Sequence, residues 1–159
     1  SFVGSFDKFR LKILHRLKKK IYIYGNAWPI NSKHKICKFV QNQEFSRTVH
    51  ESEISLNILK KQNYKSHNMR TFEIPAMNGL MLTTRSKEQN KYFPENKACY
   101  MFENIKELNY RINFILNNPK AALKVRKTGY KLSQKHSYDN RLKKLINYIN
   151  KNGQVFNFK

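Results

Sequence analysis

The sequence has few acidic residues: 10 Asp and Glu stand against 32 Lys and Arg, so the formal net charge is +22. A field of that sign attracts polyanions, and a nucleic-acid-binding protein would explain it. The basic residues, however, are spread along the whole sequence, and no basic block stands apart as a tail. We therefore expect a solvated basic surface and no specific nucleic-acid partner. Attraction to an anionic membrane or acceptor is the second alternative.

Long apolar runs are also missing. No run approaches the roughly 20 residues that span a bilayer, and the start lacks the pattern of a secretory signal peptide. These absences predict a soluble, cytoplasmic protein, with peripheral contact at the inner membrane face as an alternative. Cys37 and Cys99 have neither metal-ligand nor redox spacing and lie in apolar runs, which predicts buried thiols.

The remaining composition is that of a folded globule, with 40% hydrophobic and 13% aromatic residues. A length of 159 residues suits one domain, residues 1–159. The sequence begins with Ser1, in a strand-like stretch, which suggests a segment of a longer protein.

Strand-like and helix-like patterns alternate over the first half of the sequence. Short β-branched or aromatic runs occur at 2–6, 21–25, 35–40, 54–59 and 80–84. Between them, helical patterns occupy residues 7–19, 43–52 and about 69–77. Such alternation predicts a Rossmann-like α/β/α domain, with a mostly parallel sheet between two helical layers.

The last third is helical. Asn104, with Glu107 three residues later, predicts one helix start, and Pro119 opens the next helix, which Gly129 weakens in its middle. Ser137 is the expected cap of a final helix. Its apolar residues are expected to face inward: Leu142, Leu145, Ile146 and Ile149. After it, Phe156 and Phe158 would require a partner domain to pack on.

The segment "HNMRTFEIPAMNGLMLTT" is the candidate ligand site. Loop 60–68 follows the strand at 54–59, so it lies at the carboxyl edge of the predicted sheet, where such folds bind ligands. The free amides of the next helix and Arg70 suit phosphate, and Glu73 suits the two hydroxyls of a ribose. Compensation of the helix dipole is the alternative role for Glu73.

Several motifs in fixed order resemble one family. "NMRTFEIPAMNGLMLTT", "YFPENKACYMFENIKELNYRINFILNNP" and "GYKLSQKHSYDNR" are similar to the C-terminal domain of the spore-maturation (CgeB-like) glycosyltransferases, a branch of the GT-B enzymes; "FVGSFDKFR" and "YGNAW" are similar to the start of that domain. The resemblance spans nearly the whole chain. It implies the Rossmann-like half that holds a nucleoside-diphosphate sugar, the donor for transfer to an acceptor.

The resemblance also implies residue roles. Glu73 would hold the ribose hydroxyls, and Arg70 and the amides of Asn68 and Met69 would face the diphosphate. His67 would contact phosphate or sugar, with a solvated loop histidine as the alternative.

The start of the domain supplies the other expected contacts. Gly4 and Ser5 match a glycine turn near phosphate, and Arg10 matches the residue that neutralises the diphosphate leaving group. Gly25 and Trp28 fall where the base pocket is expected, with a core role as the alternative for Trp28.

The chain departs from the family pattern at Lys65, where many GT-B enzymes carry a second glutamate, and it has no evident carboxylate base for an acceptor. The resemblance implies that these groups come from an N-terminal GT-B domain, and that no metal is needed. We expect donor binding but little turnover from this chain alone. A nucleic-acid-binding domain or a noncatalytic interaction domain on the same fold are the alternatives.

Overall fold

The computed structural model describes residues 1–30 and 32–152, and its sheet has six parallel strands in the order β3-β2-β1-β4-β5-β6. The strands are β1 (Phe2–Val3), β2 (Tyr22–Tyr24), β3 (Lys35–Cys37), β4 (Ser55–Asn57), β5 (Met81–Thr84) and β6 (Tyr100–Phe102). The strand order runs outward from β1 to β3, returns to β4 beside β1 and continues outward to β6. This reversal between β1 and β4 is the switch point at which open α/β sheets bind ligands.

Helices cover both faces of the sheet, which confirms the predicted fold class. They are α1 (Lys8–Leu14), α2 (Asn42–Glu51), η1 (Lys61–Asn63), α3 (Arg70–Ala76), α4 (Lys87–Tyr92), α5 (Ile105–Asn117), α6 (Pro119–Ser133), η2 (Gln134–His136) and α7 (Tyr138–Asn152). α1 and α5 pack on one face, and α2 and α3 pack on the other. Within the described ranges, no helix is both long and apolar enough to cross a membrane.

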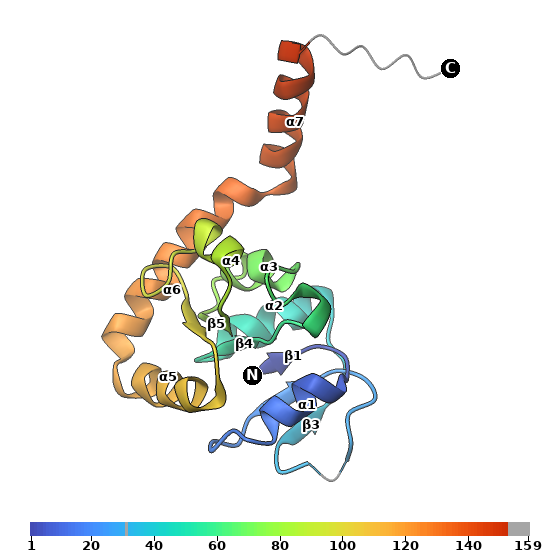
Figure 1. Cartoon of the computed structure of the whole chain (residues 1–159), viewed down its shortest axis with the longest axis vertical. Helices are drawn as coiled ribbons and strands as arrows, with labels where there is room; N and C mark the ends of the chain where they lie inside the picture. The colour runs from blue at the N-terminus through green and yellow to red at the C-terminus, as the bar shows by residue number, and fades with distance from the viewer. Residues whose placement is uncertain (31, 153–159) are drawn as a thin grey trace.

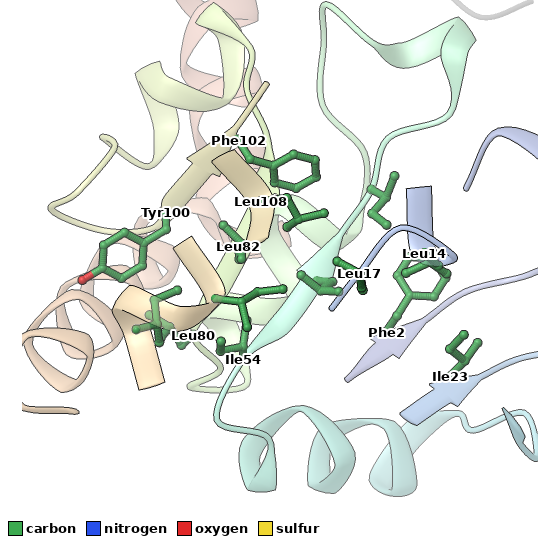
Figure 2. Packing of buried hydrophobic residues seen from close by; sticks show 14 of the residues in the cluster. Phe2, Leu14, Leu17, Ile23, Ile54, Leu80, Leu82, Tyr100, Phe102 and Leu108 are labelled. Carbon is green, nitrogen blue, oxygen red and sulfur yellow. The ribbon is translucent and has the colours of Figure 1, made fainter. Parts of the chain in front are cut away.

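Buried apolar side chains form one cluster on each face. Phe2 belongs to the cluster under α1 and α5, and its neighbour Val3 belongs to the other, because successive side chains of a strand point to opposite faces. Figure 2 shows members of the first cluster between strands and helices. Strands buried on both faces are typical of parallel sheets. Cys99 is fully buried, and this burial raises the pKa of its thiol, whereas Cys37 is half-buried.

The first helix is shorter than predicted. α1 ends at Leu14, whereas the sequence pattern extended it to residue 19. α5 holds the following turn: the amide of Lys18 donates to Asn109 Oδ1 (2.8 Å), and Asn109 Nδ2 donates to the carbonyl of Arg16 (3.2 Å). A contact 91 residues away in sequence thus replaces the last helical turn.

α4 and β6 were not predicted. Ser86 caps α4 by accepting a hydrogen bond from the amide of Gln89, and β6 pairs with β5. Both elements are short, so neither displays enough periods of its apolar pattern to identify it.

Arg85 and Arg111 hold this side of the sheet through a carboxylate network. Arg85 follows β5 and donates to Glu95 (2.7 Å) and Glu107 (2.5 Å), while Arg111 contacts the same two carboxylates. The hydrogen bonds from Arg85 are the main cause that lowers the pKa of Glu107 to about 2. Three of the chain's ten acidic residues thus serve structure here, because Glu103 also lies near Arg85.

The predicted caps of the last helices are confirmed. Asn104 accepts from the amide of Glu107, Pro119 is the first residue of α6, and Ser137 accepts from the amide of Asn140 (3.3 Å). Gly129 lies in the middle of α6, where a Cβ would come within 2.5 Å of the carbonyl of Ala98. Its role is therefore to let α6 pack closely.

The prediction that α7 faces inward is wrong for most of the helix. α7 projects away from the α/β body (Figure 1), and Leu142, Leu145 and Ile146 are 56%, 54% and 47% exposed. Phe156 and Phe158 lie outside the described residues. α7 therefore presents an apolar stripe that the described chain does not cover.

Candidate functional site

The switch point between β1 and β4 is bridged by Arg10. Asp7 starts α1 by accepting a hydrogen bond from the amide of Arg10 (3.0 Å), which places the arginine in the first turn. Its side chain is buried, and Nε donates to the carbonyl of Ile58, just after β4 (2.9 Å). Among the described residues this is its one side-chain hydrogen bond, so its Nη donors have no hydrogen-bond acceptor there.

Gly4 lies beside this guanidinium. A Cβ on Gly4 would stand 3.5 Å from one Nη atom of Arg10, and the Gly4 amide donates to the carbonyl of Tyr24 (2.9 Å). Gly4 forms a bend, and Ser5 follows it and is exposed. The predicted glycine turn and Arg10 therefore share one side of the switch point.

A second arginine acts on Arg10. Burial is the largest cause that lowers the pKa of Arg10. The negative charge of Asp7 raises this pKa, and the positive charge of Arg70 lowers it. Arginine stays charged at any physiological pH, so the two guanidinium groups repel one another. An anion placed between them would relieve this repulsion.

Arg70 and Glu73 form a pair on α3. An Nη atom of Arg70 donates to the Glu73 carboxylate, and the guanidinium lies over the ring of Phe45, 4.0 Å from its centre. Each side chain of the pair is 28% exposed. Both groups are therefore ordered by contacts yet open to a ligand.

Buried polar side chains fix α3 to the sheet. Asn68 Oδ1 accepts from the amide of Thr71 (3.1 Å), which caps the first turn of α3. The side-chain amides of Asn68 and Asn57 exchange two hydrogen bonds, each from Nδ2 to Oδ1 (3.0 and 3.1 Å). Asn57 is the last residue of β4. The predicted amide donor Asn68 thus acts through its side chain as a cap, and Met69, beside it, is 67% exposed.

Gln89 of α4 is the centre of this network. It is fully buried, its Oε1 accepts from the hydroxyls of Thr71 (2.8 Å) and Thr83 (2.9 Å), and its Nε2 donates to the carbonyl of Thr84 (2.6 Å). Four elements, β4, β5, α3 and α4, thus meet on one side chain. A glutamine in a short polar helix carries no signal of this role in sequence.

His67 lies before the cap, with its ring against Phe72 and Tyr92. Nδ1 stands 2.9 Å from one oxygen of Glu88, whose other oxygen accepts from the hydroxyl of Ser66 (2.5 Å). Neither Glu88 nor Ser66 was predicted from the sequence as a site residue.

A hollow of about 470 Å³ opens between α3 and the junction of η2 with α7. Its lining includes four predicted site residues: His67, Asn68, Met69 and Glu73. His136 and Arg141 of the motif "GYKLSQKHSYDNR" form the opposite wall, and the guanidinium of Arg141 lies 4.3 Å from the centre of the Phe72 ring. Burial, and then the charge of Arg141, lower the pKa of His136.

A model of the family described as "Glycosyl transferase-like" matches residues 9–147. The chain belongs to this glycosyl transferase-like family. No curated protein sequence matches it.

Solved structures share the fold of this glycosyltransferase domain. The C-terminal domain of a glycosyl transferase group 1 family protein from Francisella tularensis is 13% identical, with a TM-score of 0.65, over 86% of this chain and 85% of that one. A T4 phage β-glucosyltransferase mutant in complex with UDP-glucose is 16% identical, with a TM-score of 0.69, over 85% of this chain and 42% of that one. Anabaena HepE in complex with UDP is 8% identical, with a TM-score of 0.68, over 94% of this chain and 48% of that one. The chain therefore has the fold of a GT-B C-terminal domain and spans less than half the length of the latter two proteins.

Trp28 belongs to the core of the glycosyltransferase domain. It is 6% exposed, its ring meets Phe2 and Phe6 edge-on, and Nε1 donates to the carbonyl of Gly4 (2.8 Å). A ring so enclosed offers little surface to a nucleobase, which corrects the base-pocket prediction in favour of the core alternative. Its contribution to the site is to hold Gly4, beside Gly25, whose Cβ would stand 2.1 Å from the same carbonyl.

Proposed function

We propose that the chain is the nucleotide-sugar-binding domain of a glycosyltransferase that transfers a sugar from a nucleoside diphosphate to an acceptor. The observation that carries this proposal is the Arg70–Glu73 pair on α3, with Glu73 lining the hollow beside that helix, in a chain of a glycosyltransferase-like family. Two guanidinium groups suit a diphosphate, and a carboxylate suits a diol. The T4 phage and Anabaena structures are complexes with UDP-glucose and UDP, which supports the proposed ligand class.

Each residue then has a role. Arg10 stabilises charge on the leaving diphosphate, with the backbone of Gly4 and Ser5 alongside. When the donor binds, Arg70 leaves the Glu73 carboxylate and binds a phosphate oxygen instead. The Glu73 carboxylate then accepts hydrogen bonds from the ribose hydroxyls. Binding therefore replaces one ion pair by two charge-assisted contacts.

The finer family assignment is also a proposal. The order of the motifs supports a CgeB-like enzyme, and none of its donor contacts calls for a metal cofactor. Among residues 1–30 and 32–152, no three His, Cys, Asp or Glu side chains gather as metal ligands would. We propose, as the resemblance implies, donor binding without a metal, which addition of EDTA to the binding assay would test.

We propose further that an N-terminal GT-B domain completes the enzyme. The exposed stripe of α7 supports this, because contiguous apolar surface marks an interface. Coexpression of the two domains tests this interface. The interface variant combines Leu142→Asp with Leu145→Asp, and Lys143→Asp is the control. Loss of copurification in the first variant alone supports the interface.

Titration with UDP, GDP, ADP and CMP, followed by thermal shift and calorimetry, tests the donor site. A ligand that binds only the folded chain raises its melting temperature. At a ligand concentration of 100 times Kd, the free energy of unfolding increases by about 2.7 kcal/mol. We expect one nucleotide to bind, and Arg70→Ala and Glu73→Ala to weaken it at least tenfold. Arg47→Ala and Glu51→Ala are the matched controls, because they form an exposed Arg–Glu pair on α2. Equal losses in both sets, or no binding by the parent chain, would contradict the proposal.

The basic surface supports attraction to an anionic acceptor or membrane. A hollow of about 390 Å³ beside α1 is lined by Lys8, Lys12, Lys60 and Lys61, and no lysine in the described chain pairs with a carboxylate. Sedimentation with anionic and neutral vesicles at low and high salt tests this. Tight binding to DNA that resists UDP would instead favour the nucleic-acid alternative.

A further inference from the structure

His67 occupies a position that links the loop after β4 to the hollow beside Glu73. It directly precedes Asn68, the cap of α3, and lines the hollow together with Glu73. The family resemblance left two roles open for this histidine, a contact with phosphate or with sugar. Its hydrogen bonds distinguish between them.

Glu88 determines which ring nitrogen carries the proton. The hydrogen bond from the Ser66 hydroxyl is the main cause that lowers the pKa of Glu88, against the opposing effect of desolvation, so Glu88 is ionised. An ionised carboxylate only accepts hydrogen bonds, and it lies 2.9 Å from Nδ1 of His67. When the ring is neutral, the proton therefore lies on Nδ1, and Nε2 keeps its lone pair.

A lone pair on Nε2 selects its ligand. Among the described residues, the hydrogen bonds of His67 all involve Nδ1, so Nε2 is available. Hydroxyl groups donate to such an atom, whereas ionised phosphate oxygens only accept. Arg10 and Arg70 are therefore the residues suited to contact phosphate. His67 Nε2 is suited to accept a hydrogen bond from a hydroxyl group.

We infer that His67 Nε2 accepts a hydrogen bond from a hydroxyl of the sugar carried by the donor, and that Glu88 is its positioning residue. This inference rests on the proposed function.

The test compares a nucleoside diphosphate with its sugar ester. Calorimetry at pH 8, where free imidazole is neutral, measures Kd for UDP and UDP-glucose and for GDP and GDP-mannose. Binding of the diphosphate tests the proposed function, and the ratio of the two Kd values tests the inference. We expect His67→Ala to weaken the sugar ester about fivefold, the value of one hydrogen bond, and to change the diphosphate less than twofold. Exposed His15→Ala is the control.

Two conservative variants of His67 distinguish a ligand contact through Nε2 from a structural contact through Nδ1. The amide of Gln reaches the place of Nε2, and the amide of Asn reaches the place of Nδ1. We expect His67→Gln to retain part of the preference for the sugar ester and His67→Asn to lose it. The reverse order would overturn the inference, because it would leave only the structural contact with Glu88. Equal loss of diphosphate and sugar ester in His67→Ala would overturn it as well.

Glu88→Ala tests the positioning role. Without the carboxylate the ring is free to turn and to change tautomer, so the preference for the sugar ester should fall while diphosphate binding stays within twofold. Glu44→Ala is the matched control, because Glu44 also lies in the first turn of its helix. An unchanged preference in Glu88→Ala would refute the positioning role.

Discussion

Replacing Gln89 by leucine keeps the side-chain volume similar but removes every hydrogen bond at the centre of the buried network. The substitution removes Nε2, which donates to the carbonyl of Thr84. Loss of the partner of such a buried carbonyl costs about 1–3 kcal/mol. The hydroxyls of Thr71 and Thr83 keep weaker acceptors at 3.2 and 3.1 Å, so we assign them roughly 0.5 kcal/mol each. The expected loss in the free energy of unfolding is about 3 kcal/mol.

Urea denaturation measures this loss. With a slope of about 2 kcal/mol per molar, the midpoint should fall by about 1.5 M. Gln43→Leu, on the exposed face of α2, is the control and should change stability by less than about 0.5 kcal/mol. Thr83→Val combined with Gln89→Leu should cost less than the sum of the single changes, because the two share one hydrogen bond. A loss below about 1 kcal/mol for Gln89→Leu, or strict additivity, would refute the network as the anchor of α3.

Three further predictions concern stability. The pKa of Glu107 lies at about 2, below its ordinary 4.5, so its contribution is present above pH 4.5 and disappears as the pH falls toward 2; the parent should lose about 2 kcal/mol of unfolding free energy between pH 6 and 3 that Glu107→Gln does not lose. Gly129→Ala should lower the melting temperature despite the better helix propensity of alanine, because Cβ would meet the Ala98 carbonyl at 2.5 Å, and an unchanged or higher value would contradict this close packing. Gly25→Ala should destabilise the chain by roughly 2 kcal/mol or more and weaken nucleotide binding, because its Cβ overlaps the Gly4 carbonyl; normal binding by the folded variant would show that the glycine turn is not part of the site.

The sequence predicted the fold class because its local patterns agree with one architecture. Buried strands such as 54–59 alternate with amphipathic helices, and only parallel sheets bury such strands on both faces. The caps at Asn104 and Ser137 and the helix start at Pro119 were also predictable, since they depend on neighbours within a few residues.

Other features depended on contacts distant in sequence. The end of α1 is held by Asn109, and Gln89 joins residues up to 32 positions away. The inward-facing prediction for α7 failed because amphipathicity shows that a helix has an apolar face, not what covers it. Trp28 was assigned alternatives for the same reason, since only packing against Phe2 and Phe6 decides between core and ligand.

The sequence by itself determined the alternation of strands and helices and the presence of Arg10, Arg70 and Glu73 near strand ends. These properties follow from local propensities and from the order of residues along the chain. Only the tertiary structure brought Arg10 within electrostatic reach of Arg70, paired Arg70 with Glu73 and joined His67 to Glu88. The physical reason is that charge coupling, side-chain pairing and tautomer choice depend on distances of a few ångströms between segments, and the folded sheet sets those distances.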